Sequence, residues 1–421
     1  MGVDAKVVKV LEGCFGRKAL EQRARELGVV RRERKVTAVS LVLSLVTSAV
    51  SGEEKRSISS ARREFEALTG QPIEESAWRK RLNAALLRLL VELLGRVLAA
   101  TGRLHKFDDF EDILAGDSTT LMLPSPCGVQ SSAIYPSTVD GKGGLKISTV
   151  LSLGSESLAD FNFAAARYHD RRILRERVFL KKGVLGLLDM GYADHDFLAE
   201  IDGAGAFFIV PLKTTTRLTL VRARRGIPRS RTRRGTLLDG RLRYGDVVDA
   251  DVQVSTSNGQ RRLRAVMVRL AKRDGTVVDC WYLTNLPPTF ASEAVAELYR
   301  LRWQVERFFA HGKGIARLDH ITSAAPTIIF IQIVASLLAI ALTRAVSIDI
   351  AHGDSEAVIS PDRALKVMAR FLPRIAEAIL RCDGSLPRIV SGFIRVFRVE
   401  AQSPNPGRLP AIYASSQRKA A

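Results

Sequence analysis

The residues of this sequence best suited to chemistry lie in the run Tyr299–Lys313, which reads YRLRWQVERFFAHGK. At about 100° per residue on a helix, four polar residues of the run share an arc of about 60°: Tyr299, Arg302, Glu306 and Lys313. Apolar residues occupy a separate arc, as expected for a helix that packs one face inward. One carboxylate among cations, beside a phenol, suits a metal ligand next to a bound phosphate backbone. The alternative is an amphipathic helix with a solvated charged edge.

The spacing of these four residues resembles the YREK signature of DDE transposases of the insertion-sequence-four type. Two residues separate Tyr299 from Arg302, three separate Arg302 from Glu306, and six separate Glu306 from Lys313. Trp303 also fits that pattern. Several residue types at fixed spacings are a more specific signal than a lone short motif. The family also requires two aspartates upstream.

Two aspartates upstream meet that requirement. Asp117 lies at the centre of a predicted strand, Ile113–Leu123, where an aspartate is disfavoured and therefore invites a functional explanation. Asp189 directly follows Gly183–Leu188, a short apolar run that is typical of a buried central strand. Metals and small ligands gather at the carboxyl ends of such strands.

Other acidic residues lie close to each of the three positions. The alternatives are Asp108, Asp109 and Asp112 for the first, Asp194 and Asp196 for the second, and Glu297 for the third. Asp194 and Asp196 are better suited to a helix N-terminus, where negative charge is stabilised.

Cleavage of a phosphodiester and strand transfer both need an activated oxygen nucleophile and a stabilised leaving oxygen. Two Mg²⁺ ions about 3.5–4 Å apart meet both needs, one on each side of the phosphorus. Mg²⁺ prefers carboxylate oxygens and keeps several waters, so three converging acidic side chains suffice. The resemblance therefore implies that Asp117, Asp189 and Glu306 are catalytic residues and metal ligands, with Mn²⁺ as a substitute ion.

The resemblance also implies DNA-binding roles for other residues. Tyr299 and Arg302 would grip phosphates of the transferred end, and Lys313 would contact the backbone. Trp303 would pack beneath them or stack on a displaced base, as an aromatic can. The family pattern after the second aspartate, F…I…G…F-I-x-R-x-K, is matched by Phe197, Ile201, Gly205, Phe208, Ile209 and Lys213. Pro211 stands where an Arg is usual, so one phosphate contact is missing or is supplied by the arginine-rich insertion described next.

The hydrophobic pattern predicts an α/β protein in three parts. Residues 1–108 are expected to form a helical N-terminal DNA-binding domain, and residues 346–421 a C-terminal helical region for dimerisation or structure. Residues 109–345 show three strands, helix, strand, helix, strand, the order of an RNase H-like catalytic core with a mixed sheet flanked by helices. A β-rich insertion at 214–285 interrupts this core. It opens with a basic run, Arg222–Arg234. We expect this run to be a loop that contacts the phosphate backbone of DNA strands, or else a solvated charged loop.

The strands and two C-terminal helices can be assigned from these patterns. The predicted strands are Ile113–Leu123, Leu145–Leu153, Ala159–Ala165, Gly183–Leu188 and Ala206–Leu212 in the core, and Asp249–Val254, Leu263–Leu270 and Val277–Thr284 in the insertion. Near the C-terminus we expect two separate helices, Ala364–Leu372 and Ile375–Arg381.

A helix, tight turn and second helix are predicted within Ser60–Leu82. The first helix ends at Gly70, which suits a C-terminal cap, and the second carries Arg79, Lys80 and Arg81. This is the layout of a major-groove reader, although it is also common in helical bundles. We expect this region to recognise the ends of a mobile element.

The composition points to a polyanionic partner. The 421 residues include 64 Lys+Arg and 44 Asp+Glu, which gives a formal net charge of +20. Double-stranded DNA is the expected partner, and an anionic membrane surface is the alternative. The four cysteines form no C-x-x-C pair, and the N-terminus has no signal-like apolar core. A reducing, cytoplasmic location is therefore expected. Thr327–Thr343 imitates a membrane span but is predicted to be a buried helix.

The sequence therefore predicts a Mg²⁺-dependent transposase that cuts inverted-repeat ends of its element and joins them to target DNA, as a DNA-bound homodimer. Two alternatives stay open. One is a catalytically inactive DNA-binding relative, and the other is a nuclease of the same fold without strand transfer.

Overall fold

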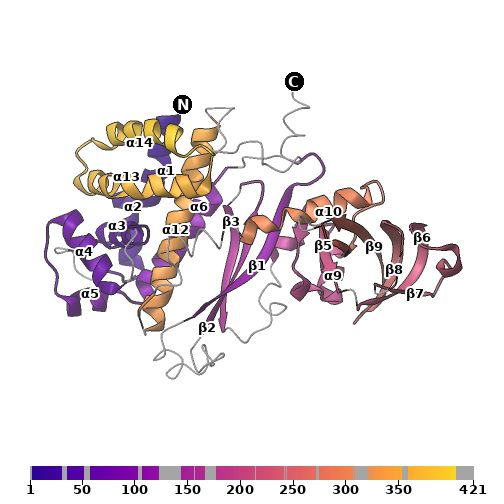
Figure 1. Cartoon of the computed structure of the whole chain (residues 1–421). Coiled ribbons are helices and arrows are strands. Elements are labelled where there is room, and N and C mark those ends of the chain that lie inside the picture. The colour runs from indigo at the N-terminus through magenta and orange to yellow at the C-terminus, as the bar shows by residue number, and fades with distance from the viewer. Residues whose placement is uncertain are drawn as a thin grey trace.

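The structure is a computed structural model of the whole chain (Figure 1). It describes residues 2–30, 36–51, 57–102, 107–122, 144–155, 157–165, 177–213, 215–240, 242, 244–271, 275–306, 308, 321–323, 325–352 and 359–403. The predicted loop 124–144 and the last twenty residues lie almost entirely outside these ranges.

The described chain is a mixed α/β protein built on one ten-stranded sheet with the order β3-β2-β1-β4-β5-β10-β9-β8-β6-β7. Its first half consists of β1 (Asp112–Met122), β2 (Gly144–Ser152), β3 (Ser157–Ala165), β4 (Val184–Leu187) and β5 (Phe207–Leu212). β1 is antiparallel to β2 and parallel to β4, which is in turn parallel to β5. The five core strands predicted from the sequence are confirmed to within about two residues at each end.

Burial fits the interior position of β4 in the sheet, between β1 and β5. All four of its residues are buried, and neighbouring strands flank it on both sides. A continuous apolar run is typical of a strand covered on both faces. The helix predicted between the fourth and fifth core strands is also confirmed, as α9 (His195–Gly203) between β4 and β5. Most of the helix expected before β4 lies outside the described residues, and Arg177–Leu180 form a 3₁₀ turn.

The insertion continues the same sheet. Its strands are β6 (Arg217–Arg225), β7 (Leu237–Asp239), β8 (Val247–Thr256), β9 (Gly259–Ala271) and β10 (Val277–Thr284). β10 returns to pair antiparallel with β5, so the insertion extends the edge of the core sheet. It forms the right-hand end of the molecule in Figure 1.

The prediction of a loop over the whole basic run Arg222–Arg234 was wrong. Its first four residues belong to β6, and Arg229–Arg231 form a 3₁₀ turn. The strand extends because β6 pairs with β8, and Arg224 of β6 forms ion pairs with Asp249 and Asp251 of β8. Opposite charges across a strand pair stabilise it, which a reading of the run in isolation overlooks.

Gly226 makes the turn that follows β6, and it provides a test of this pairing. Its φ is +74°, and an added Cβ would lie 1.7 Å from the Val247 carbonyl oxygen. Gly235 has a similar φ of +88° with nothing near its Cβ position, so it is the matched control. We expect Gly226→Ala to lower the free energy of unfolding by about 3 kcal/mol or more, and Gly235→Ala by about 1 kcal/mol. Urea denaturation measures the free energy of unfolding of both variants. Equal losses in the two variants would contradict the close approach of Gly226 to the Val247 carbonyl oxygen.

Helices from both ends of the chain share one apolar core. They are α1 (Val3–Phe15), α2 (Arg17–Glu26), α3 (Ala38–Ser48), α4 (Ile58–Thr69), α5 (Glu75–Arg81), α6 (Ala84–Ala100), α12 (Pro326–Ala351), α13 (Pro361–Arg381) and α14 (Leu386–Glu400). Figure 1 shows α12 running through this body, between helices from the two ends of the chain. The N-terminal and C-terminal helical regions therefore pack as one unit on one side of the sheet.

α12 contains the membrane-like stretch of the sequence. By length and composition it could cross a bilayer, yet 78% of its most apolar window is buried inside the protein. The neighbouring helices α3, α6 and α13 supply that cover. A helix that is apolar on all sides and surrounded by other helices is the buried helix that the sequence predicted.

The prediction of two helices after residue 363 was wrong, because α13 runs without a break through Pro373. Proline removes one backbone hydrogen bond and usually kinks or ends a helix. Here Leu372, Ile375 and Ile379 are all buried on one side of α13. Continuous burial of that face outweighs the local cost of the proline.

Candidate active site

The two candidate aspartates lie at equivalent places on neighbouring parallel strands. In the register of β1 with β4, Ala115 is opposite Leu187. Asp117 and Asp189 each come two residues later. Parallel strands are about 4.8 Å apart, and residues two apart project to the same face of a strand. The register therefore brings both carboxylates just past the carboxyl-terminal end of the paired stretch of these two adjacent strands.

The third candidate carboxylate comes from the segment after α10 (Ser292–Arg300), and its helix differs from the prediction. The prediction of a single helix over Tyr299–Lys313 was wrong. α10 ends at Arg300, and the next two residues, Leu301 and Arg302, form a turn. The chain is helical again at 303–306. Across the break, hydrogen bonds such as Arg302 N to Tyr299 O (3.0 Å) join residues three apart, the tighter pattern of a 3₁₀ turn.

Arg302 connects the strand and the helix. Its Nη1 donates to Asp117 Oδ2 at 3.1 Å, and its Nη2 donates to Glu306 Oε1 at 2.6 Å. The guanidinium carbon lies 5.8 Å from the centre of the Tyr299 ring. The Arg302 side chain is only 16% exposed. The structure thus brings together Tyr299, Arg302, Glu306 and Asp117, whereas Lys313 lies outside the described residues.

Charge interactions show that Asp189 also lies near Asp117 and Arg302. Burial raises the pKa of the Asp117 carboxyl, and the negative charges of Asp189 and Glu306 raise it further. The Ser118 N–H and the Arg302 charge act in the opposite direction. Burial also raises the pKa of the Tyr299 phenol well above its usual range. Both Asp189 and Glu306 therefore lie within electrostatic reach of Asp117, and the Arg302 guanidinium lies beside it.

The donor chemistry fits Mg²⁺, but the present arrangement does not. Carboxylate oxygens are the ligands that Mg²⁺ prefers. Within the described ranges, however, no three His, Cys, Asp or Glu side chains lie close enough together to hold a metal ion. Arg302 occupies the space between Asp117 and Glu306 and forms an ion pair with each of them. As arranged here, these two carboxylates are engaged by the guanidinium, and Asp189 lies near them.

Two of the alternative acidic residues have structural roles. Asp112 is buried and accepts hydrogen bonds from the Ser152 hydroxyl and the Gly154 N–H, which pins the turn after β2. Asp194 accepts from the N–H groups of Asp196 and Phe197 and caps α9, as its sequence position indicated. Their hydrogen bonds explain these carboxylates without catalysis.

Trp303 is not a core residue. It is 60% exposed, whereas Val305 two positions later is fully buried. Burial in the core is therefore not the position of this side chain, and its role toward DNA stays a prediction. A large exposed aromatic beside Glu306 is well placed to stack on a planar ligand.

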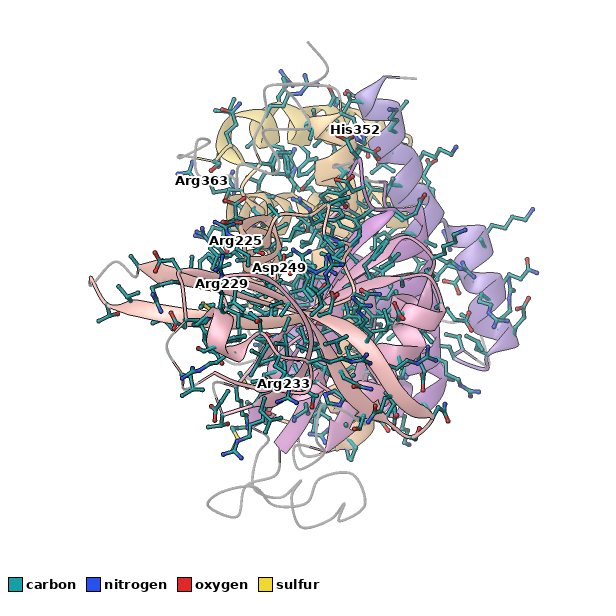
Figure 2. The ribbon with its side chains drawn as sticks, turned by 90° about the vertical axis from the view of Figure 1, so that its right-hand side faces the viewer. Arg225, Arg229, Arg233, Asp249, His352 and Arg363 are labelled. Carbon is teal, nitrogen blue, oxygen red and sulfur yellow. The ribbon has the colours of Figure 1, made fainter. Side chains whose placement is uncertain are left out.

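The sequence missed a buried ion pair that anchors the start of α10. Arg264 on β9 is 4% exposed and donates to both carboxylate oxygens of Asp249 on β8, at 3.0 and 2.6 Å. It also donates to the carbonyl oxygens of Pro287 and Phe290, at 3.0 and 2.9 Å. Figure 2 shows Asp249 among the strands of the insertion. No local sequence pattern indicates this ion pair. It depends on the register of β8 with β9 and on the loop at Pro287, which lies 23 residues after Arg264.

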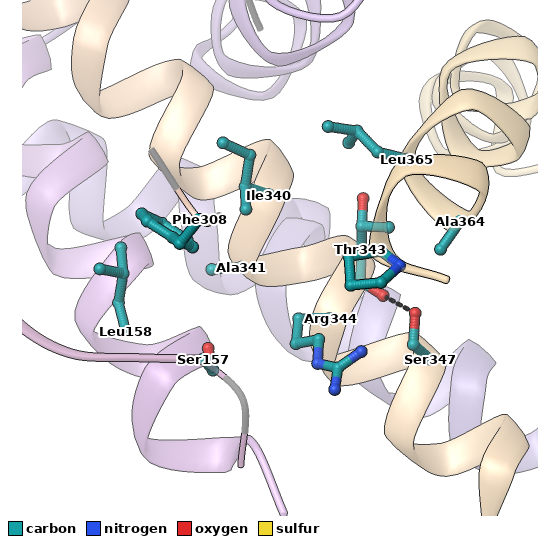
Figure 3. A pocket seen from close by; sticks show the side chains of 11 residues that line it. Ser157, Leu158, Phe308, Ile340, Ala341, Thr343, Arg344, Ser347, Ala364 and Leu365 are labelled. Carbon is teal, nitrogen blue, oxygen red and sulfur yellow. Dashed lines mark hydrogen bonds between the residues drawn. The ribbon is translucent and has the colours of Figure 1, made fainter. Parts of the chain in front are cut away.

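Two aromatic contacts hold the segment that carries Glu306. On the insertion side, the rings of Tyr282 and Tyr299 lie 5.1 Å apart. On the helical side, Phe308 lines a hollow with Leu158 of β3 and Ile340 of α12 (Figure 3). The segment is therefore held between the insertion and the helical body.

The predicted helix, turn and helix near residue 70 are confirmed. Gly70 adopts a left-handed conformation with φ +65° after α4, and α5 follows. Trp78 is fully buried, and its ring centre lies 5.5 Å from that of Phe65. Arg79 forms a surface ion pair with Glu75. Lys80 and Arg81 lie beside it on α5, and DNA contact by these residues stays a prediction.

Comparison with known proteins identifies the class. Residues 108–342, more than half of the chain, match the family described as Transposase DDE domain, and the chain belongs to that family. It is 27% identical over 231 residues to transposase y4zB of Sinorhizobium fredii, covering 54% of this chain and 59% of that protein. It is 36% identical over 84 residues to the transposase for insertion sequence element IS421 of Escherichia coli. That alignment covers 20% of this chain and 22% of the relative.

Among solved structures, the piggyBac transposase in a synaptic complex with hairpin DNA is similar at a TM-score of 0.46 and 10% identity. The match covers 98% of this chain and 89% of that one.

Proposed function

We propose that this chain is a transposase that cuts double-stranded DNA at the inverted-repeat ends of its element and joins those ends to target DNA. The observation that carries the proposal is the equal register of Asp117 and Asp189 on parallel strands, with Glu306 tied to Asp117 through Arg302. Membership of the transposase DDE family and the net charge of +20 support it. We further propose that β1 to β5 form an RNase H-like core, and that the chain belongs to the YREK group.

Asp117, Asp189 and Glu306 would hold two Mg²⁺ ions, or Mn²⁺ in their place, once Arg302 has released its carboxylates. When bound, such ions activate the attacking oxygen and stabilise the leaving one. The protein's own contribution is positioning, because strand register fixes the two aspartates and the anchored α10 segment fixes Glu306.

The remaining predicted residues would hold the DNA. Tyr299, Arg302, Lys213 and Lys313 would bind backbone phosphates, and Trp303 would stack on a displaced base. Lys213 is exposed directly after β5, at the same sheet edge as Asp189. The insertion adds exposed arginines, among them Arg225, Arg229 and Arg233, on the part of the molecule nearest the viewer in Figure 2.

We assign end recognition to α5 and assembly to a DNA-bound homodimer in the cytoplasm, with no membrane partner. The division into residues 1–108, 109–345 with the insertion 214–285, and 346–421 is part of the same proposal. Because α12, α13 and α14 share a core with α1 to α6, the C-terminal region would also support the DNA-binding helices.

The α5 proposal can be tested by salt dependence. Replacing both Arg79 and Lys80 by Ala should make the slope of log K for DNA binding against log salt concentration less steep by about 2. Each phosphate contact that is lost no longer releases its counterions on binding. Filter binding or fluorescence anisotropy on DNA flanking the reading frame measures the slope. Arg398→Ala, an exposed arginine on α14, is the control and should leave it unchanged. An unchanged slope in the double variant would remove α5 from the DNA interface.

A strand-transfer reaction tests the whole proposal. Purified protein, Mg²⁺, a duplex carrying the flanking DNA and a supercoiled target should yield joined products. Cutting without joining would favour the nuclease, and no cutting with either Mg²⁺ or Mn²⁺ would favour the inactive DNA-binding relative.

A further inference from the structure

We propose that Arg302 occupies the metal site of the DNA-free protein and must leave it before metal ions can bind, so that DNA controls metal loading. This inference depends on the proposed function, since it requires that Asp117, Asp189 and Glu306 form a metal site. It goes beyond that function because it assigns Arg302 a second position and a second role.

The first step is that Arg302 uses the atoms that a metal ion needs. Its two terminal nitrogens bind Asp117 Oδ2 and Glu306 Oε1, one oxygen from each carboxylate. The other oxygen of Asp117 accepts the Ser118 N–H at 2.7 Å. Both oxygens of Asp117 are therefore engaged before any metal arrives. A guanidinium and a divalent cation cannot occupy the same space between two carboxylates.

The second step concerns charge. Removing the guanidinium alone would leave the partly buried Asp117 carboxylate with the negative charges of Asp189 and Glu306 nearby and no cation between it and Glu306. Like charges at such a site are unfavourable, so Arg302 stabilises the site in the absence of metal. A metal ion that displaces Arg302 must replace these ion pairs, which weakens its apparent affinity in the DNA-free protein.

The third step is that a DNA phosphate offers Arg302 an alternative position. Its Nε is buried and has no hydrogen-bond partner within the described part of the chain. Arginine binds phosphate through two parallel charge-assisted hydrogen bonds, so one phosphate can replace the two carboxylate bonds that Arg302 gives up. The Glu306 side chain is 42% exposed and Trp303 is 60% exposed, so a ligand can approach this side of the helix.

The consequence is reciprocal coupling between DNA and metal. DNA that draws Arg302 away frees Asp117 and Glu306 for metal, and metal at those carboxylates leaves Arg302 available for DNA. By linkage, each ligand must raise the affinity for the other by the same factor. The carboxylates are thus kept from binding metal until DNA is in place.

Mn²⁺ binding to the full-length protein, measured from the loss of the free-ion EPR signal, tests the inference without any cleavage assay. Without DNA, we expect Arg302→Gln to bind Mn²⁺ at least about tenfold more tightly than the unaltered protein. Arg300→Gln removes the same charge from an exposed position two residues away and should not change the affinity. Thermal unfolding establishes that both variants are folded.

A second measurement keeps the test decisive if Arg302→Gln is unstable. Duplex DNA from the flanks of the reading frame should tighten Mn²⁺ binding to the unaltered protein. In Arg302→Lys, which retains the charge but cannot bridge two carboxylates in the same way, the DNA effect should be smaller. Equal Mn²⁺ affinity of the unaltered protein and Arg302→Gln, with no effect of DNA, would overturn the inference while leaving the metal site intact. Absence of Mn²⁺ binding to either protein, even with DNA, would instead remove the metal site and the proposed function with it.

Discussion

Replacing Asp117 or Asp189 by Asn, or Glu306 by Gln, is expected to reduce Mg²⁺-dependent cleavage of end DNA by on the order of a thousandfold or more. Each replacement keeps the size of the side chain but removes a negative oxygen that the proposed metal site needs. DNA binding should survive, because the same changes make the site less negative toward phosphate. Cleavage is measured on labelled duplexes in denaturing gels, and binding is measured on the same duplexes by anisotropy.

Asp109→Asn is the matched control for these variants. Asp109 is one of the alternative acidic residues near β1 and is exposed. Its replacement should leave both cleavage and binding unchanged. Full cleavage by any one of the three site variants would remove that residue from the site. A loss of cleavage in Asp109→Asn would move the site to the segment before β1.

The largest expected effect on stability follows from removing Arg264. Arg264→Met leaves the Asp249 carboxylate buried without its main partner, and leaves the Pro287 and Phe290 carbonyls without their donor. Breaking a buried pair from one side typically costs about 3–5 kcal/mol, because an uncompensated charge remains. The free energy of unfolding from urea denaturation should fall by about that amount.

Two further variants identify the cause. Arg261→Met, at an exposed position three residues earlier on β9, should change the free energy of unfolding by less than about 0.5 kcal/mol. Replacing both Arg264 and Asp249 by apolar residues should be milder than the sum of the single changes, because no buried charge is left unpaired. Additive losses would show that the two side chains act independently, which the geometry contradicts.

The elements that carry the candidate carboxylates could be predicted where local chemistry determines them. Asp117 stands out because an aspartate interrupts an apolar strand, and Asp189 because it follows a run of apolar residues. The parallel register of β1 with β4 then places the two aspartates just past the carboxyl-terminal end of the paired stretch of these strands. Trp303, Arg302 and Glu306 were recognised from their spacing, and Arg302 and Glu306 are in contact in the structure.

Features that depend on distant parts of the chain could not be predicted. The break at Leu301 and Arg302 follows neither a proline nor a glycine, so no local signal marks it. The pairing of β10 with β5 joins residues about seventy apart and turns an apparent insertion into an extension of the sheet. The Asp249–Arg264 anchor requires the register of β8 with β9 to be known first. Helical wheels and alternation describe one element at a time, and these features arise between elements.

The most direct test of the central claim is an X-ray structure of the protein bound to its end DNA in the presence of Mn²⁺, with anomalous scattering used to locate the ions. The account predicts Mn²⁺ peaks bound by the carboxylates of Asp117, Asp189 and Glu306, with Arg302 turned away toward a phosphate. Mn²⁺ peaks elsewhere on the protein, with these carboxylates still joined through Arg302 while end DNA is bound, would contradict it.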